Sequence, residues 1–212
     1  MIKRLGLLLV ISIASLSFAG EGWIFRGRLI NVAPNDDSSD ILTTGTQVSV
    51  DDAWVPEVDL TYMFTSNWGL EVIAATSPHD LATEKGTLGG ANAGEVWALP
   101  PTFTLQYHFG YGSAVDFYAG LGLNYTLFYS YDLSDDLAGL GVSDIDFDSS
   151  IGLAANFGVD FQINEKWVFN IDLKYIDMST DADLELAAGG ILDTVDVDIN
   201  PFVAGIGVGY RF

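Results

Sequence analysis

Alternation of apolar and polar side chains at every second residue is the feature of this sequence that most restricts its fold. Between residues 117 and 131, an apolar or aromatic side chain occupies every odd position, and mostly small or polar side chains occupy the even positions. Runs at 53–65 and 148–163 repeat the pattern. A period of two is the signature of a β-strand, and no apolar run after residue 19 reaches the ~18 residues of a membrane-spanning helix. The sequence therefore predicts an all-β protein.

Eight strands are predicted, and their connections alternate between long and short. The strands are expected at residues 22–33, 53–65, 68–76, 95–109, 117–131, 148–163, 167–178 and 195–212. The long connections are 34–52, 77–94, 132–147 and 179–194, and the short ones are 66–67, 110–116 and 164–166. Because lipid offers no hydrogen-bond partners, a sheet in a membrane must close on itself. The pattern predicts an eight-stranded antiparallel up-and-down transmembrane β-barrel with long extracellular loops and short periplasmic turns.

A secreted, soluble eight-stranded barrel is the alternative, because it shows the same alternation with its apolar face turned inward. The positions of the aromatic side chains favour the membrane barrel. They gather at the expected strand ends, as in the two girdles of an outer-membrane barrel, with Phe64 and Trp68 by a short turn and Trp54 toward a long connection. The chain also ends in Phe212, with Tyr210 on the same strand face. This ending resembles the sorting signal that such barrels present to the barrel assembly machinery.

Residues 1–19 have the three-part organisation of a secretory signal peptide. Two basic residues precede an apolar run over 5–18, and Ser17-Phe18-Ala19 supplies the small side chains of a cleavage site. The run is shorter than the ~20 residues that a spanning helix requires. We therefore expect Sec-type export, removal of residues 1–19, and a barrel over residues 20–212 in the bacterial outer membrane.

The charge of the chain excludes several classes of partner. It carries 29 acidic and 8 basic side chains, for a formal net charge of −21, which argues against a nucleic-acid partner. The lack of cysteine excludes disulfides and thiolate metal sites, and no cofactor is expected. With 49% apolar residues, the chain also lacks the low hydrophobicity of disordered acidic proteins.

More than half of the acidic side chains lie in or beside the four long connections, where the simplest interpretation is a solvated loop. A sharper hypothesis is a divalent-cation site that also bridges lipid phosphates, since Ca²⁺ favours clustered carboxylate oxygens. The candidates for this metal site are Asp135, Asp136, Asp144 and Asp146. Their spacing fits no ordered calcium-loop motif, so the sequence predicts no firm metal site.

Several stretches along the chain, in the same order, resemble the OmpW family of small outer-membrane barrels. These stretches are residues 60–64, NWGLEVIAAT at 67–76, LPPT at 99–102, YAGLGLNYT at 118–126, GVDF at 158–161, Trp167 with Asn170, YID at 175–177 and GYRF at 209–212. The resemblance covers nearly all of residues 20–212. It implies an eight-stranded barrel with a narrow, largely apolar interior that passes small hydrophobic molecules, and some members serve as bacteriocin receptors.

The less bulky strand faces are expected to point into the lumen. The apolar path through this lumen is predicted to consist of Val55, Met63, Ile73, Phe128 and Ile176. A charged network is predicted from Arg26, Arg28, Glu57, Asp59, Glu71, Asp172 and Lys174. The network is interpreted first as buried ion pairs that rigidify a thin barrel, and second as a gate or a path for polar solutes. Four prolines, which lack a ladder N–H, mark positions where the wall either opens sideways or relieves pairing near the rim: Pro56, Pro100, Pro101 and Pro201.

Two functions follow from these features. The first is a passive conduit for small hydrophobic solutes, formed by a monomer in contact with outer-membrane lipids. The second is a surface interaction or receptor barrel that displays acidic extracellular loops above a closed, salt-bridged lumen. No enzymatic activity is expected, because His108 falls at the turn end and His79 lies in a long connection without a recognisable triad.

Overall fold

The computed structural model describes residues 22–41, 44–87, 89–139 and 141–212. The predicted signal peptide, residues 1–19, lies outside these residues. Among the described residues, no helix is long and apolar enough to cross a membrane. The one short helix of this part of the chain is α1 (Asp135–Gly139).

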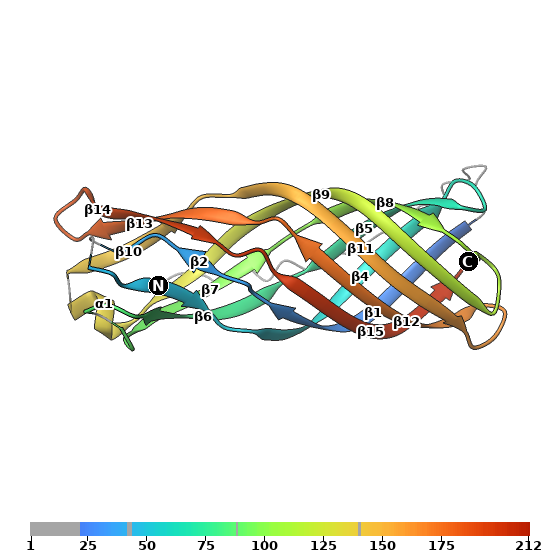
Figure 1. The fold of residues 1–212 in the computed structure, drawn as a ribbon, viewed down its shortest axis with the longest axis horizontal. Helices are drawn as coiled ribbons and strands as arrows, with labels where there is room; N and C mark the ends of the chain where they lie inside the picture. The colour runs from blue at the N-terminus through green and yellow to red at the C-terminus, as the bar shows by residue number, and fades with distance from the viewer. Residues whose placement is uncertain (1–21, 42–43, 88, 140) are drawn as a thin grey trace, which may run out of the picture.

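Eight antiparallel strands close into a barrel (Figure 1). In order around the wall they are β1 (Gly22–Ala33), β4 (Ala53–Met63), β5 (Trp68–Ala75), β8 (Thr102–His108), β9 (Val115–Leu133), β11 (Ser150–Gln162), β12 (Trp167–Ile176) and β15 (Phe202–Arg211). Every neighbour is antiparallel, and the pairing of β15 with β1 closes the ring. Short turns join β4 to β5, β8 to β9 and β11 to β12 at one end, which we call the turn end. The predicted eight-stranded up-and-down barrel is confirmed.

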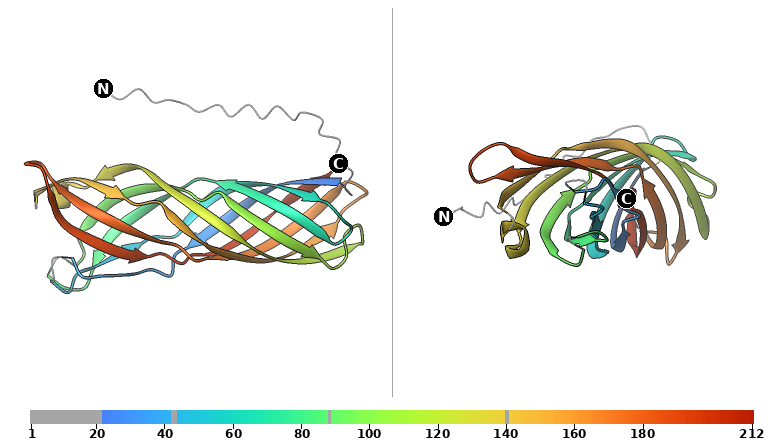
Figure 2. Two further views of the ribbon diagram at one scale, coloured as in Figure 1. Left: turned by 90° about the horizontal axis from the view of Figure 1, so that it is seen from above. Right: turned by 60° about the vertical axis from the view of Figure 1, so that its left-hand side comes forward.

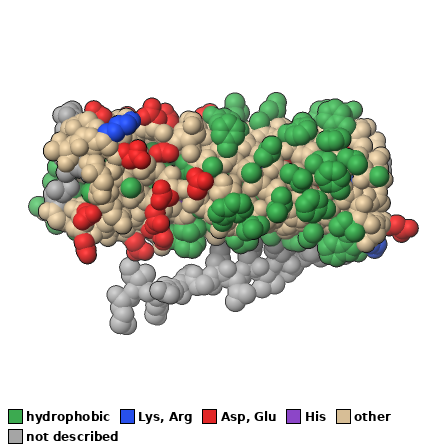
Figure 3. Space-filling view, turned by 60° about the horizontal axis from the view of Figure 1, so that its bottom comes forward, with side chains coloured by type: hydrophobic (Ala, Val, Ile, Leu, Met, Phe, Trp, Pro, Cys, Tyr) green, Lys and Arg blue, Asp and Glu red, His purple; other side chains and the backbone are tan. Residues whose placement is uncertain are grey.

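The wall alternates as the sequence predicts, with bulky apolar side chains on the outside. In β12, for example, Trp167, Phe169 and Ile171 are exposed, whereas the residues between them are buried. Aromatic side chains such as Phe64 and Phe109 are exposed at the turn end. Figure 3 shows hydrophobic side chains over the barrel half of the face drawn, and acidic side chains over the other half. This apolar belt is the surface that faces hydrocarbon in a membrane.

The long connections are not simple loops, so the predicted long loops need correction: two of them form hairpins, and the other two contribute strands that pair with these hairpins. Their strands are β2 (Asp37–Ser38), β3 (Gln47–Val50), β6 (Ser77–Glu84), β7 (Asn92–Leu99), β10 (Val142–Phe147), β13 (Ser179–Leu186) and β14 (Ile191–Asp198). Together with α1 they form the part that we call the extension, opposite the turn end (Figure 2). Alternation is present here too, since Ala182 and Leu184 of β13 point inward between outward carboxylates. The acidic outer face made these strands resemble solvated loops in the sequence.

Two predicted strands are divided at prolines, at the level where barrel and extension meet. The predicted strand 95–109 consists of β7 and β8, separated by Pro100 and Pro101. The predicted strand 195–212 is divided between β14 and β15, next to Pro201, where Asn200 has a φ of 38°. A proline cannot donate to the ladder, so the pairing partner changes at these points.

The extension contains two separate sheets. One has the order β9-β7-β6-β3 and continues the barrel, and the other has the order β10-β13-β14-β2. Within the described residues, β9 and β10 form no ladder with each other. Side-chain hydrogen bonds link β2 to β3, for example from the backbone N of Val48 to Ser38 Oγ at 2.8 Å. The wall of the extension therefore has an unpaired seam between β9 and β10.

Candidate functional site

The lumen of the barrel half is filled by buried ion pairs centred on two arginines of β1. Arg26 binds Asp160 of β11 through two nitrogens, at 3.2 Å from Nε to Oδ1 and 2.8 Å from Nη2 to Oδ2. Its Nη1 lies 3.0 Å from Asp59 Oδ1 and donates to Thr61 Oγ1 at 2.9 Å. Arg26 thus joins strands on opposite sides of the barrel, and its side chain is fully buried.

Arg28 makes a second set of contacts one layer closer to the extension. Its Nη1 lies 2.8 Å from Glu57 Oε1 and 2.9 Å from Asp59 Oδ2, the latter an ion pair without the geometry of a hydrogen bond. Its Nη2 lies 3.2 Å from Glu71 Oε1. Lys174 completes the layer, with its Nζ at 2.9 Å from Glu57 Oε1 and 2.7 Å from Asp172 Oδ1. The structure therefore brings together all seven residues of the predicted charged network.

Several members of this network escaped the sequence reasoning. Asp160 lies on the same strand face as Gly158 and was not distinguished from other polar residues of the lumen side. Tyr118 donates a hydrogen bond from Oη to Asp172 Oδ2 at 2.8 Å and accepts one from Asn170 Nδ2 at 3.0 Å. Asp116, which was also missed, lies with its Oδ2 2.8 Å from Nδ1 of His108, the histidine that the sequence places at the turn end. A bulky or charged side chain at an even, inward position was the signal that could have identified these residues.

The network fills the lumen of the barrel half with paired charges. Four basic side chains, Arg26, Arg28, Lys174 and Arg211, take part in ion pairs with six carboxylates, Glu57, Asp59, Glu71, Asp116, Asp160 and Asp172. Nearly all of these side chains are buried. Removing one partner of such a pair leaves an uncompensated buried charge, which is strongly unfavourable. The arrangement therefore resists opening along the barrel axis.

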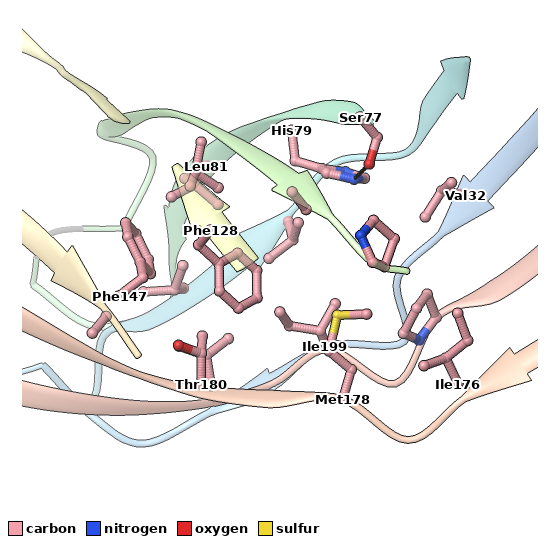
Figure 4. Close-up of a pocket in the computed structure, with 18 of the residues that line it drawn as sticks. Val32, Ser77, His79, Leu81, Phe128, Phe147, Ile176, Met178, Thr180 and Ile199 are labelled. Carbon is pink, nitrogen blue, oxygen red and sulfur yellow. Dashed lines mark hydrogen bonds between the residues drawn. The ribbon is translucent and has the colours of Figure 1, made fainter. Parts of the chain in front are cut away.

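Directly beyond the network, the extension encloses an apolar cavity of about 90 Å³ (Figure 4). Most of its lining is aliphatic, from both sheets of the extension and from the upper part of the barrel, for example Val32, Leu81, Met178 and Ile199. Glu57 and Lys174 line it from the network side. An engineered apolar cavity of ~150 Å³ holds benzene, so a modest outward movement of side chains makes room for a small hydrocarbon. The site suits an apolar molecule.

The five residues of the predicted apolar path fall into two groups. Ile73, Phe128 and Ile176 line the cavity. Val55 is buried in a small cluster with Ile30, Ala53 and Val203 and does not line it. Met63 lies near the turn end, beyond the ion pairs, where its sulfur crowds Gly69. The described residues therefore form an apolar chamber in one half of the molecule and not a continuous apolar path between its ends.

One polar corner interrupts the apolar lining, where Ser77 and His79 of β6 meet (Figure 4). His79 Nδ1 lies 2.8 Å from the carbonyl oxygen of Asp51, and its Nε2 lies 2.9 Å from Ser77 Oγ. Burial lowers the pKa of His79 below its ordinary value of 6.5, although the nearby carboxylates of Asp52 and Asp80 act against this. The imidazole is therefore neutral at pH 7.

A second, open pocket of about 250 Å³ lies at the seam between β9 and β10. Phe128 and Phe147 line both this pocket and the apolar cavity, with their ring centroids 6.0 Å apart. Tyr131 packs edge-on against Phe147, at 5.5 Å between centroids. Backbone groups of two unpaired strand edges cannot lie in hydrocarbon, so this seam must sit at or above the lipid head groups. Three aromatic rings separate the seam from the cavity.

The acidic candidates for a metal site lie on two different elements. Asp135 and Asp136 are exposed on α1, and Asp144 and Asp146 are exposed on β10. Two of the four have backbone partners, since Asp136 accepts from the N–H of Asn92 and Asp144 from that of Ile145. Within the described ranges, no group of three or more histidine, aspartate or glutamate side chains is arranged to hold a metal ion.

The last strand carries the predicted assembly signal on its outer side. Phe212 is 66% exposed, and its ring packs edge-on against that of Tyr210 at 4.9 Å. Tyr210 in turn contacts Trp167 of β12 at 5.1 Å. The two residues are thus accessible from the lipid side of the barrel, as a recognition signal requires.

A closed antiparallel barrel of eight strands with an exposed apolar belt and a buried polar lumen defines a small outer-membrane barrel. The chain belongs to the OmpW family, whose model matches residues 19–212. It is 39% identical to Outer membrane protein W of Vibrio cholerae over 98% of this chain and 97% of that protein. The crystal structure of OprG from Pseudomonas aeruginosa is similar with a TM-score of 0.84 and 38% identity, over 91% of this chain and 97% of OprG.

A further relative is the dibenzothiophene metabolism operon protein PahQ of Pseudomonas aeruginosa, 28% identical over 94% of this chain and 93% of that protein. These similarities place the protein in the bacterial outer membrane. The extension is therefore on the extracellular side, and the turn end faces the periplasm.

Proposed function

We propose that this barrel is a passive conduit through which small hydrophobic molecules cross the polar outer layer of the outer membrane. The observation that carries the proposal is the apolar cavity in the extension, directly above a sealed lumen. A chamber lined by aliphatic side chains lowers the free energy of an apolar solute that would otherwise cross a layer of saccharides and water. The name of PahQ, which links a relative to dibenzothiophene metabolism, is consistent with an apolar solute.

The sealed lumen determines the exit route in this proposal. An apolar molecule cannot continue along the axis, because it would have to displace the ion pairs of Arg26 and Arg28. The seam between β9 and β10 offers a way out at the level of the lipid head groups, past Phe128 and Phe147. Ring rotation at these two residues opens the path without breaking a ladder hydrogen bond. The solute thus passes from the medium into the membrane, and the outer-membrane lipid is its acceptor.

Uptake into vesicles tests the conduit. The vesicles carry lipopolysaccharide in their outer leaflet, since the saccharide layer is the barrier to be bypassed, and the probe is an apolar dye that fluoresces only in hydrocarbon. We expect faster development of fluorescence in vesicles with the barrel than in empty ones. Equal rates with and without the barrel would remove the proposal.

A surface interaction barrel is the second candidate function, and the closed lumen is the observation that favours it. The extension presents outward carboxylates such as Asp181, Asp196 and Asp198, and Figure 3 shows acidic side chains gathered on this half. A basic partner would bind such a surface with strong salt dependence. The buried apolar chamber has no role in that function, so we place the conduit first.

A further inference from the structure

The hydroxyl groups on the cavity wall share one property: their protons are already donated to the protein. Thr83 Oγ1 donates to the carbonyl of Ala91 at 3.1 Å, and Thr102 Oγ1 donates to the carbonyl of Pro100 at 3.0 Å. Thr180 Oγ1 donates to the carbonyl of Asp148 at 2.7 Å. Each acceptor is a backbone carbonyl, which has no proton of its own, so the direction of these hydrogen bonds is fixed.

The hydroxyl proton of Ser77 is also donated to the protein, and the tautomer of His79 shows this. The carbonyl of Asp51 accepts only, so His79 Nδ1 must carry the imidazole proton that makes this 2.8 Å hydrogen bond. In the neutral ring, Nε2 is then an acceptor, and the 2.9 Å contact with Ser77 requires the serine hydroxyl to donate. The only proton of Ser77 is thereby used, and its oxygen lone pairs remain.

The four hydroxyls differ in whether their oxygen also receives a hydrogen bond. Thr83 Oγ1 accepts from the N–H of Ala91 at 3.0 Å, and Thr102 Oγ1 accepts from Asn124 Nδ2 at 2.9 Å. Among the described residues, no donor reaches Ser77 Oγ, which is 3% exposed and lines the cavity. Thr180 Oγ1, on the opposite side of the cavity in Figure 4, is in the same situation.

We propose that the cavity selects apolar molecules that carry one hydrogen-bond donor, such as phenols and alcohols, and that Ser77 Oγ accepts this hydrogen bond, with Thr180 as a second acceptor. The inference rests on the proposed function, because it specifies the solute class of the same cavity. A solute with only acceptor groups, such as an ether or a ketone, meets no free side-chain donor among the described residues and loses its hydration without compensation. A pure hydrocarbon enters without that penalty but gains no hydrogen bond.

A serine hydrogen-bonded to a histidine also occurs in hydrolytic active sites. The geometry around Ser77 distinguishes solute binding from hydrolysis. Hydrolysis requires donors aimed at a developing oxyanion next to the nucleophile. In the described part of the cavity wall, the hydroxyl and imidazole donors all have protein acceptors, and Lys174 is held by Glu57 and Asp172. The pair is therefore better suited to binding than to catalysis.

Three solutes of similar size test the proposal: phenol has a donor, anisole has only an acceptor, and toluene has neither. Binding to the barrel in lipid nanodiscs at pH 7.5 is followed through the NMR signals of the Ile176 and Met178 methyl groups, which line the cavity. Partition into empty nanodiscs is measured for each solute and subtracted. We expect phenol to bind more tightly than anisole after this correction.

The Ser77→Ala variant assigns the effect to a single oxygen. It should weaken phenol binding by about 3- to 10-fold, as the loss of one hydrogen bond predicts, and leave toluene unchanged. A Ser77→Ala, Thr180→Val double variant should abolish the preference. Thr83→Val is the matched control, because it removes a cavity hydroxyl whose oxygen is already occupied, and the preference should persist. Ser77→Thr keeps a hydroxyl and should retain it as well.

Each alternative result has a distinct meaning. If all three solutes bind equally and Ser77→Ala changes none of them, the donor preference is wrong while the apolar conduit stands. If none of them shifts the cavity methyl signals, the proposed function fails together with this inference. Release of phenol from phenyl acetate by the parent protein and not by Ser77→Ala would show that Ser77 is a nucleophile and would overturn the binding role.

Discussion

Arg26 connects strands across the lumen of the barrel. It is fully buried and binds carboxylates from β4 and β11, which lie on different sides of the barrel. The two-nitrogen contact with Asp160 uses the planar guanidinium in a way that a lysine cannot reproduce. Such a residue fixes the relative positions of strands that do not pair with each other.

Replacement of Arg26 by methionine should therefore destabilise the barrel by about 3–5 kcal/mol, because Asp160 loses its main partner inside a closed lumen. The free energy of unfolding is measured by denaturant titration in detergent micelles. Lys166→Met is the control, since Lys166 is exposed in a turn, and it should change the value little. A loss below about 1 kcal/mol for Arg26→Met would mean that the ion pairs are not the seal that we describe.

His79 predicts how the extension responds to acid. Its pKa lies below 6.5 in the folded protein because the ring is buried, with Asp51, Asp52 and Asp80 facing it and partly opposing the shift. In the unfolded chain His79 binds a proton near pH 6.5, whereas in the folded protein it does so only at lower pH. The free energy of unfolding therefore keeps its full value above pH 6.5 and falls as the pH drops below it. Protection factors for amide exchange in β6 and β7, which are corrected for the pH dependence of the intrinsic exchange rate, should fall between pH 7.5 and 5.5, and His79→Gln should lose this dependence. A titration midpoint above 6.5 in the NMR signals of His79 would contradict this explanation.

At the scale of the strands, glycine on the inner face of β11 makes room for the network. Gly158 lies directly opposite Tyr118 in the register of β9 and β11, and the tyrosine ring covers it. A Cβ atom on Gly158 would lie 2.2 Å from Cζ of that ring. The ring must occupy this position to donate its hydrogen bond to Asp172. Gly158 in β11 thus leaves the space that the ring of Tyr118 in β9 occupies.

Gly158→Ala should therefore displace Tyr118 and cost about 1–3 kcal/mol of stability, as overpacking in a filled interior does. Gly27→Ala is the matched control, because no atom lies within 4 Å of the added Cβ, and it should be neutral or slightly stabilising. Denaturant titration of the two variants provides the comparison. Equal stability of both variants would show that the tyrosine ring has room to move.

Particular strands show how much of this structure the sequence could predict. The alternation in β9, β11 and β12 identified the barrel wall, because lipid-facing and lumen-facing residues differ strongly in bulk. In β13 and β14 the outer face meets water and carries carboxylates, so the same alternation looked like a charged loop. The apolar residues between those carboxylates in the predicted connection 179–194, such as Ala182 and Leu184, were the signal that was missed.

The sequence predicted one part of the site, the charged network, and not the other, the apolar chamber. Charged residues at inward positions identified the network, since a buried charge needs a partner. The chamber was not predictable, because it is lined by residues from connections that were expected to be loops, such as Leu81 and Leu184. The hydrogen bond between Ser77 and His79 depends on the strand conformation of β6, which the predicted loop did not contain.

At the scale of the whole molecule, the chain divides into two halves with different chemistry. The barrel half is apolar outside and charged inside, and the extension is acidic outside and apolar inside (Figure 3). This inversion follows from the surroundings, because the barrel faces hydrocarbon and the extension faces water. In the proposed conduit, an apolar solute moves from the interior of the extension to the exterior of the barrel through the seam between β9 and β10.

Filling the chamber is the measurement that tests this account most directly. Ala182→Phe adds a ring to a residue that lines the cavity, and Ala204→Phe adds the same ring to an exposed position on the outer side of β15. In lipopolysaccharide-covered vesicles, we expect Ala182→Phe to slow uptake of the apolar dye at least severalfold, roughly to the rate of empty vesicles if the plug is complete. Ala204→Phe should match the parent protein. Unchanged uptake by a folded Ala182→Phe barrel would show that the chamber is not the route.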